Sequence, residues 1–398
     1  MFLVFLLIIL IIPVCSYSID SSYFDYDENF MKVTQYEVLG KLPNPFIMDN
    51  GERVKTKEDW DKRRKEIYKT AVELQYGTIP PKPEVFKSEI CYQNHSNMSV
   101  RITCGTKEKQ ITWTLKILLP KGVSNPPVVL DGDLCFNVNF NSEYVNEYLS
   151  RGIALATFDR TVLANDNTAR GRRTGPLYEM YPDYTFGALG AWAWGFMRCA
   201  DALEMTNYFD MSALAFTGHS RGAKTAMLAG VLDERAKIVN PNNSNACSCS
   251  CYRIHSEIVH EDGNKERNET LKDLWDAVGY WIGSEMGNYA DREADLPFDC
   301  HYLKALVAPR ILLVGEATSD GWTNEIGSWQ TSMAATEIYK FLGCENNLKW
   351  YYRKGYHDHL PVDAAMLCNV ILNSKGKEEL YPYFYKRPFK EYERIWNF

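Results

Sequence analysis

The sequence predicts an α/β fold: a three-layer sandwich in which helices flank a mostly parallel central sheet on both faces. Strand-like and helix-like runs alternate along most of the chain, as they do when helices connect parallel strands. Two strand-like runs, 128–130 and 153–156, are continuously apolar, which is typical of strands covered on both faces. No internal repeat, low-complexity segment or linker rich in proline and glycine interrupts residues 40–390, so we expect one domain there.

The composition supports a large buried core and excludes some classes of partner. Of the 398 residues, 45% are hydrophobic and 13% are aromatic, which is unlike a disordered chain. The formal net charge is −7 without a long run of one sign, so no basic surface for nucleic acid is expected. A small molecule or a polysaccharide fits better as a partner.

The first 18 residues, MFLVFLLIILIIPVCSYS, are typical of a secretory signal peptide. An apolar run ends at the small residues Cys15 and Ser16, and we expect cleavage near Ser16 or Ser18. The protein is therefore expected to be secreted to the extracellular space, without stable membrane insertion. The run is shorter than the ~20 apolar residues that a spanning helix needs. No Lys or Arg lies near Met1, however, and this leaves an uncleaved anchor as the alternative.

We expect residues 19–398 to form a single catalytic domain, of which residues 19–85 are an N-terminal extension. Within the extension, the segment from Thr56 to Asp59 has a capping-box pattern that predicts the start of a helix. Gly77 ends that helix. Its buried side is predicted from apolar residues at helical spacing: Trp60, Ile67, Ala71, Val72 and Leu74.

The remaining elements are predicted in an alternating order. Strands are expected over 111–117, 128–130, 153–156, 213–216, 311–314 and 348–352. Helices are expected over 186–204, 221–231, 330–342 and 362–372.

Cysteines point to an oxidising compartment. Removal of the signal peptide takes Cys15 and leaves ten: 91, 104, 135, 199, 247, 249, 251, 300, 344 and 368. An even number in a secreted chain predicts disulfides, although the sequence does not give their connectivity. The alternating Cys247, Cys249 and Cys251 could suggest a metal site, but their spacing is not that of zinc ligands and no histidine cluster completes them. We therefore expect disulfides to distant cysteines and no metal.

Four glycosylation sequons agree with secretion, although each is a weak signal alone. Asn94 and Asn97 lie between Cys91 and Cys104, as expected of an exposed, disulfide-stapled loop. The other two sequons begin at Asn242 and Asn268. We expect a glycoprotein.

The motif Gly218-His219-Ser220-Arg221-Gly222 lies between a predicted strand and a predicted helix. In a nucleophile elbow, the glycines permit a tight, strained turn that projects the serine, and the helix N-terminus favours a developing oxyanion. The alternative is an ordinary strand-to-helix turn in which Ser220 is only an N-cap. The flanking elements favour Ser220 as a nucleophile.

An activated serine needs a histidine base, and the chain has seven histidines: 95, 219, 255, 260, 301, 357 and 359. His219 is expected to point away from its neighbour Ser220. His357 and His359 follow the last predicted strand, where a loop could bring them over the serine. His357 is the preferred base, and His359 remains the alternative.

The loop after Val314 supplies the acid that orients such a base. It offers Glu316, Asp320 and Glu325, one strand-helix unit before the histidine, which is the usual place for the acid in an α/β-hydrolase. Asp320 is the preferred acid. Because it precedes Gly321, it could also be an ordinary turn residue.

Beyond these motifs, the chain resembles the glucuronoyl esterases, a carbohydrate esterase family with the α/β-hydrolase fold, over nearly its whole mature length. The landmarks, in order, are PNPFIMDNGERVKTKEDWDKRRKEI, YGTIPPKPE, GALGAWAWGFMRCADALE, TGHSRGAKTAMLAGVLDERAKIVNPNNS, DLPFDCHYLKALVAPR and RKGYHDH. The resemblance implies hydrolysis of the ester between 4-O-methyl-glucuronoyl groups on xylan and lignin alcohols. It also implies acyl transfer through serine without a cofactor.

The same resemblance assigns roles to individual residues. It implies Ser220 as nucleophile, Asp320 as acid and His357 as base, with Arg221 in the oxyanion hole. It further implies Lys224 and Trp322 as substrate-binding residues, for sugar hydroxyls and for the uronate site. Independently, Lys224 lies one helical turn after Ser220 and can therefore point toward the same opening.

One departure from the family pattern concerns the acid. Many members carry a catalytic Glu twenty-three positions after the serine, where this chain has Asn243. Asn cannot stabilise an imidazolium as a carboxylate does, so the acid is expected from the later loop, at Asp320. The following loop, SNACSCSC, is altered as well, which changes the expected shape of the substrate pocket.

The sequence thus predicts a secreted, monomeric serine carboxylic-ester hydrolase acting on a carbohydrate ester. One alternative is an esterase for another sugar-linked or small ester. A second, from a different class, is a non-catalytic carbohydrate-binding protein that keeps the fold, a hypothesis that Asn243 mildly favours.

Overall fold

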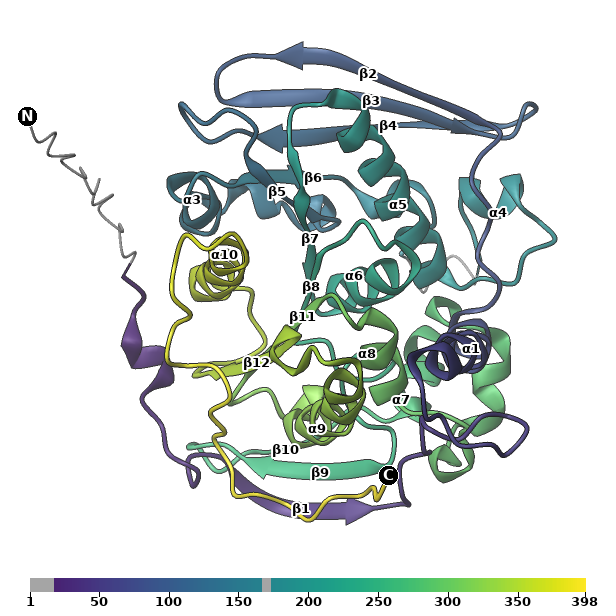
Figure 1. The fold of residues 1–398 in the computed structure, drawn as a ribbon, viewed down its shortest axis with the longest axis vertical. Helices are drawn as coiled ribbons and strands as arrows, with labels where there is room; N and C mark the ends of the chain where they lie inside the picture. The colour runs from purple at the N-terminus through teal and green to yellow at the C-terminus, as the bar shows by residue number, and fades with distance from the viewer. Residues whose placement is uncertain (1–17, 167–172) are drawn as a thin grey trace, which may run out of the picture.

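The computed structural model describes residues 18–166 and 173–398, and its centre is a nine-stranded sheet (Figure 1). From one edge to the other, the strands are β12 (Leu348–Arg353), β11 (Ile311–Ala317), β8 (Ile238–Asn242), β7 (Asp210–His219), β5 (Pro127–Asp131), β6 (Ala154–Thr157), β4 (Gln110–Leu118), β3 (Asn97–Gly105) and β2 (Val85–Gln93). The six strands from β12 to β6 pair in parallel, and β4, β3 and β2 add an antiparallel edge. The prediction of a mostly parallel central sheet is confirmed.

Helices cover both faces of this sheet. They are α1 (Lys57–Tyr68), α2 (Leu74–Tyr76), α3 (Ser142–Ser150), α4 (Pro176–Met180), α5 (Ala188–Thr206), α6 (Arg221–Leu232), α7 (Leu271–Val278), α8 (His301–Val307), α9 (Glu325–Leu342) and α10 (Pro361–Ser374). In Figure 1, α3 and α10 lie together on one side of the parallel strands, and α5, α6 and α8 lie on the other.

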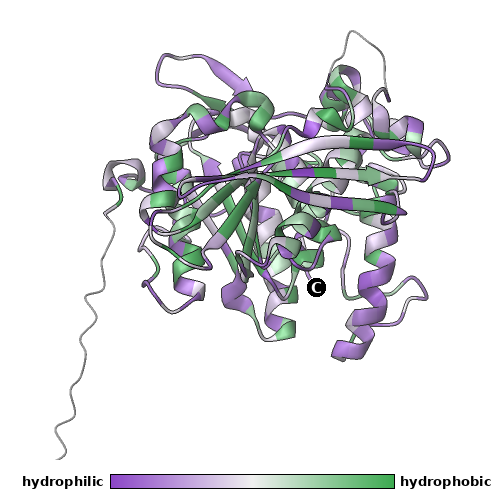
Figure 2. Cartoon of the chain, turned by 90° about the horizontal axis from the view of Figure 1, so that it is seen from above, coloured by the Kyte–Doolittle hydropathy of each residue, from purple (hydrophilic) through white to green (hydrophobic). Residues whose placement is uncertain are grey.

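Each central strand contributes to two separate cores. Along β5, Val128 and Leu130 pack with the core on the side of α5 and α6, whereas Val129 packs with the core that contains α10 residues. Successive strand residues point to opposite faces, so a strand covered on both sides must be apolar throughout. Figure 2 shows this pattern as green central strands, while much of the outer helical surface is purple.

The predicted N-terminal helix is confirmed at both ends. Thr56 caps α1, because its hydroxyl accepts from the Asp59 backbone N–H at 3.1 Å. In the reverse direction, the Asp59 carboxylate accepts from the Thr56 backbone N–H at 3.2 Å. A π-helical segment, Lys69–Glu73, and the short α2 continue the helix. Gly77, at φ 79°, then ends it.

A second, three-stranded sheet was not predicted. It is formed by β1 (Lys32–Val38), β9 (Ile254–Val259) and β10 (Lys265–Arg267), with β9 in the middle. It joins part of the N-terminal extension to the segment after β8, and it lies apart from the main sheet in Figure 1.

The segment that was expected to be a disulfide-stapled loop is instead the β2–β3 hairpin. Cys104 pairs with Phe86 in the hairpin register, whereas Cys91 lies at the bulge between Ile90 and Tyr92, opposite the start of β3. The two cysteines are therefore several residues apart along the ladder, too far for a disulfide. All ten cysteines in the described part of the chain carry free thiols, which contradicts the disulfide prediction.

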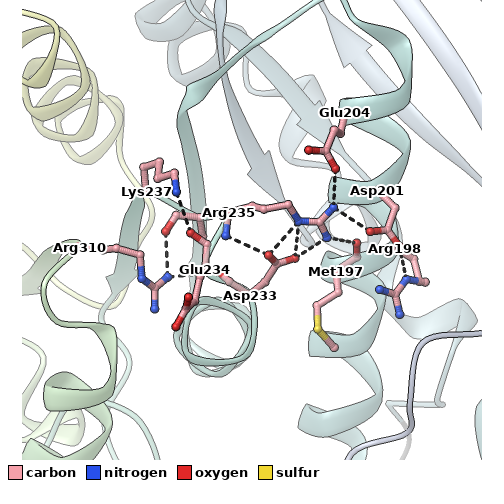
Figure 3. Close-up of polar contacts among 10 residues, drawn as sticks. Met197, Arg198, Asp201, Glu204, Asp233, Glu234, Arg235, Lys237 and Arg310 are labelled. Carbon is pink, nitrogen blue, oxygen red and sulfur yellow. Dashed lines mark hydrogen bonds and ion pairs between the residues drawn. The ribbon is translucent and has the colours of Figure 1, made fainter. Parts of the chain in front are cut away.

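An ion-pair network stabilises the side of the molecule at which the parallel strands begin, that is, their N-terminal ends (Figure 3). Arg235, just before β8, pairs with Asp201 at 2.7 Å and with Glu204 at 3.1 Å, both on α5. It also pairs with Asp233 at 2.7 Å, and Arg198 pairs with Asp201 at 2.6 Å. The network therefore lies at the N-terminal ends of the strands, whereas Ser220 lies at their C-terminal ends.

Residues 1–17 of the predicted signal peptide lie outside the described residues. Within residues 18–166 and 173–398, no helix combines the length and the apolar character that crossing a membrane requires.

Candidate active site

Ser220 occupies a strained turn between β7 and α6. Its backbone has φ 55° and ψ −119°, a conformation that costs a non-glycine residue about 1–3 kcal/mol. Its N–H donates to the Asn242 carbonyl of β8 at 3.0 Å, which ties the turn to the neighbouring strand. A Cβ on Gly218 would lie 2.6 Å from the Gly222 backbone, so the turn closes only with glycine there. This is the geometry predicted for a nucleophile elbow.

His357 and Asp320 are brought together from the loops after β12 and β11. The Nδ1 atom of His357 lies 2.6 Å from Oδ2 of Asp320, whose side chain is buried. The same oxygen accepts from Nδ2 of Asn243 at 2.7 Å. A carboxylate held in this way fixes the imidazole and stabilises its protonated form.

The other two candidate acids lie outside the loop, since Glu316 belongs to β11 and Glu325 begins α9. Glu316 accepts from the Ser328 hydroxyl at 2.7 Å, and burial raises its pKa to about 8. Glu325 accepts from the Asp320 N–H at 3.3 Å, and burial raises its pKa well above the usual range. Asp320 is therefore the acid placed beside the histidine.

His359, the alternative base, lines the same cavity but contacts Tyr144. Its Nε2 is 3.3 Å from the Tyr144 hydroxyl, and burial lowers its pKa to about 3, which keeps the ring neutral. Its ring stacks on His219, with centroids 5.4 Å apart.

The expectation that His219 points away from the site is wrong. Its ring lies 4.6 Å from that of His357, centroid to centroid, and its Nδ1 is 2.9 Å from Oδ1 of Asn242. The reason is strand register, since His219 still belongs to β7 and pairs with Asn242 of β8. Burial, with a smaller contribution from His357, lowers the pKa of His219.

A cavity of about 370 Å³ opens over these residues. Ser220, Arg221 and His357 line it together with His219 and His359, and residues of the segment 133–144 complete the lining. This segment contains two short 3₁₀ turns, η3 (Leu134–Phe136) and η4 (Val138–Phe140).

Arg221 is held beside the cavity by an acid and two aromatic rings. Its Nη1 donates to Asp166 at 2.9 Å. Its guanidinium lies 5.0 Å from the Trp281 ring centre and 5.5 Å from that of Phe136. The side chain is 38% exposed, so its charge is fixed in place yet accessible to a ligand.

Lys224 is buried, and its ammonium is engaged by the protein. It donates to Glu269 at 3.1 Å, to the Ala246 carbonyl at 2.6 Å and to Asn245. Burial raises the pKa of Glu269, although Lys224 opposes that shift. The Glu269 N–H donates to the carbonyl of Trp322 at 3.0 Å, so Glu269 joins the two predicted substrate-binding residues.

Sequence reasoning missed Glu269 and Phe136. Glu269 was seen only as the middle residue of a sequon, and Phe136 belongs to a segment without a periodic pattern. Trp322, in the 3₁₀ turn η10 (Gly321–Thr323), is 36% exposed and presents its ring to solvent. Within the described ranges, no cluster of three or more His, Cys, Asp or Glu side chains is arranged to hold a metal ion.

Comparisons with known proteins give one consistent result. A family profile described as "Glucuronyl esterase, fungi" matches residues 102–343. The 4-O-methyl-glucuronoyl methylesterase of Cerrena unicolor is 30% identical over 341 residues, which cover 84% of this chain and 69% of that protein. The protein of the same name from Podospora anserina is 30% identical over 335 residues, covering 82% of this chain and 66% of its own length.

Solved structures agree on the fold. A carbohydrate esterase family 15 glucuronoyl esterase from Caldicellulosiruptor kristjansonii superposes with a TM-score of 0.73 at 28% identity, over 84% of this chain and 91% of that one. A glucuronoyl esterase mutant from Sporotrichum thermophile, solved with methyl 4-O-methyl-β-D-glucopyranuronate, gives 0.69 at 23% identity, over 89% and 92%. The predicted α/β-hydrolase fold is confirmed.

Proposed function

The chain belongs to the glucuronoyl esterase family, and from this premise we propose that it is a serine esterase that hydrolyses carboxylic esters of 4-O-methyl-glucuronic acid through an acyl-enzyme. The observation that carries the proposal is the contact of His357 with Asp320 at 2.6 Å, on a cavity that Ser220 also lines. Ser220, Asp320 and His357 follow three different strands of the sheet, β7, β11 and β12, and Ser220 and His357 line the same cavity.

In the proposed mechanism, His357 removes the proton from the Ser220 hydroxyl as that oxygen attacks the ester carbonyl. The imidazolium that forms is stabilised by Asp320, whose orientation is fixed by Asn243. His357 then protonates the departing alcohol. Water, activated by the same histidine, hydrolyses the acyl-enzyme and releases the uronic acid.

The oxyanion of the tetrahedral intermediate forms at the N-terminus of α6. Backbone N–H groups there and the guanidinium of Arg221 supply positive potential without having to reorganise, because Asp166 and Trp281 already hold the guanidinium. No step requires a cofactor.

We assign the two halves of the ester to opposite sides of Ser220. The uronate lies toward Lys224, Glu269 and Trp322, which combine charged hydrogen-bonding groups with an exposed ring. None of these three is among the described residues that line the 370 Å³ cavity. The alcohol therefore enters that cavity, where the exposed ring of Phe136 is available for stacking.

We further propose that the protein is secreted as a monomer and carries N-glycans on the β2–β3 hairpin. Asn94 is exposed at the hairpin turn, whereas Asn242 and Asn268 are 0% and 2% exposed and cannot accept a glycan once folded. Asn94→Gln should therefore remove a mass that a glycosidase also removes. An unchanged mass for Asn94→Gln, with Asn97 intact, would assign the glycan to the neighbouring sequon.

Two alternative functions, a non-catalytic carbohydrate-binding protein and an esterase for another ester, can be distinguished from the proposed one with a fluorophosphonate probe and two ester substrates. An esterase of this mechanism should be labelled at Ser220, and Ser220→Ala should not be labelled. Absence of labelling would favour the non-catalytic carbohydrate-binding alternative. Labelling together with faster hydrolysis of an acetyl ester than of methyl or benzyl glucuronate would favour an esterase for another small ester.

A further inference from the structure

A buried ion pair, Asp133 with Arg160, contacts the turn that carries Ser220 and has no role in the mechanism above. Asp133 follows β5, the strand beside β7, and is 4% exposed. Arg160 follows β6 and is fully buried. The two side chains form an ion pair, and the Arg160 guanidinium also lies 5.0 Å from the ring centre of Trp192.

The carboxylate of Asp133 contacts the turn on the side that precedes the serine. Its Oδ2 accepts from the backbone N–H of His219 at 3.0 Å. On its own side, the Asp133 N–H donates to Oδ1 of Asp131 at 2.7 Å, so the acid is itself held in place. Burial and the neighbouring Asp133 raise the pKa of Asp131 well above its usual range.

The same carboxylate also contacts the turn on the side that follows the serine. A Cβ on Gly222 would lie 2.2 and 2.3 Å from the two carboxylate oxygens of Asp133. Real Cβ atoms do not approach so closely, and this carboxylate cannot withdraw, because His219 and Arg160 hold it. The second glycine of the motif is therefore required by Asp133.

We propose that Asp133 is a positioning residue for the nucleophile: it fixes both flanks of Ser220, and Arg160 neutralises it so that no net negative charge lies beneath the forming oxyanion. This inference rests on the proposed function. A strained residue keeps its conformation only when its surroundings over-determine it. The bond from Ser220 to Asn242 holds the turn from β8, and Asp133 holds it from β5 on the opposite side.

The test replaces the pair rather than one partner, because a lone buried charge could prevent folding. Asp133→Asn with Arg160→Met removes both charges and retains an amide oxygen and a flexible apolar chain. We expect kcat for a glucuronate ester to fall about 100-fold, the size of effect that a misplacement near 1 Å produces. We expect KM for methyl glucuronate to change less than about twofold, because the proposed uronate-binding residues Lys224, Glu269 and Trp322 are untouched. Methyl glucuronate is the substrate of choice because Asp133 lines the cavity assigned to the alcohol and Arg160 lies 5.2 Å from the Phe136 ring centre. The rate of fluorophosphonate labelling should fall in parallel.

A matched control comes from the ion-pair network at the N-terminal ends of the strands, far from Ser220. Asp201 and Arg198 are also buried and paired, at 2.6 Å, but they lie in the network of Figure 3. Asp201→Asn with Arg198→Met should lower the melting temperature while kcat stays within about threefold of wild type. Equal losses of kcat in both double variants would overturn the proposal and leave only a structural role.

A second measurement tests the contact with Gly222 independently of fold stability. Gly222→Ala should reduce the labelling rate strongly in the wild type, but much less in the background Asp133→Ala with Arg160→Met, where the carboxylate is gone. Additive losses would contradict the proposal. Wild-type protein that is labelled but does not cleave a glucuronate ester would refute the proposed substrate alone, since labelling still reports on the turn.

Discussion

Asn243 donates a hydrogen bond to Asp320, with 2.7 Å between Nδ2 and Oδ2, at the oxygen that His357 contacts. The family resemblance places a catalytic Glu at this position in many members, so Asn243 mildly favours the non-catalytic alternative, while the acid is expected at Asp320. Asn243 lies where those members carry the Glu, and its amide contacts the carboxylate of Asp320, the acid in the proposed mechanism.

Asp320 and Asn243 should therefore differ in the size of their effects. Asp320→Asn removes the charge that stabilises the imidazolium, and we expect kcat to fall about 10⁴-fold. Asn243→Ala removes only one of the two contacts to that carboxylate, and we expect about a tenfold loss. Glu325→Gln is the matched control, because the Glu325 side chain is buried nearby and accepts from the Asp320 N–H without a contact to His357, and it should retain kcat within about threefold. A large loss in Glu325→Gln would move the acid role away from Asp320.

Lys224 and Glu269 should determine recognition of the acid half of the ester. Replacing both, as Lys224→Met with Glu269→Gln, avoids leaving one buried charge unpaired. We expect KM for methyl glucuronate to rise at least about tenfold, while hydrolysis of an aryl acetate is unchanged. Steady-state kinetics with both esters measure this. Equal losses on both substrates would indicate general damage to the fold.

Phe136 should determine preference for the alcohol half. Phe136→Ala removes the stacking surface in the cavity, and we expect kcat/KM for benzyl glucuronate to fall about fivefold to tenfold relative to methyl glucuronate. Phe140→Ala is the control, since Phe140 lies in the same segment, is 80% exposed and is not among the described cavity-lining residues. The same benzyl-to-methyl ratio in Phe136→Ala and wild type would place the alcohol elsewhere.

Glu316 should make stability depend on pH. Burial raises its pKa from 4.5 to about 8, so between these values the folded state retains a proton that the unfolded chain releases. The contribution of Glu316 to the free energy of unfolding is fully present below pH 4.5 and is lost as pH rises through 8, by about 1.4 kcal/mol for each pH unit between these two pKa values. Glu316→Gln should flatten this decline in urea unfolding at pH 5, 6.5 and 8. The exposed control Glu285→Gln should keep the wild-type slope, and an unchanged slope in Glu316→Gln would contradict the assignment.

The parallel core of the fold was predictable because its strands must be apolar on both faces. Runs such as 128–130 and 213–216 identified β5 and β7, and the capping box at Thr56 identified α1. The strand β8 was missed because its sequence, IVNPN, mixes apolar residues with asparagine and proline. The second sheet was missed because β1, β9 and β10 are short or polar and alternate weakly.

Only those site residues could be predicted from the sequence that belong to motifs with a fixed order along the chain. Ser220, Asp320 and His357 follow a fixed order along the chain, and the structure brings the last two into contact. The place of His219 depends on its register with β8, and the contacts of Asp133 depend on which strands are neighbours. Neither relationship leaves a local pattern in the sequence.

The most direct test of the central claim is hydrolysis of methyl 4-O-methyl-glucuronate, compared with that of an aryl acetate, by the wild type and by Ser220→Ala. We expect the wild type to cleave the glucuronate ester with the higher kcat/KM and Ser220→Ala to cleave neither. Faster acetate release by the wild type, or glucuronate hydrolysis that survives in Ser220→Ala, would contradict the assignment of a serine glucuronoyl esterase.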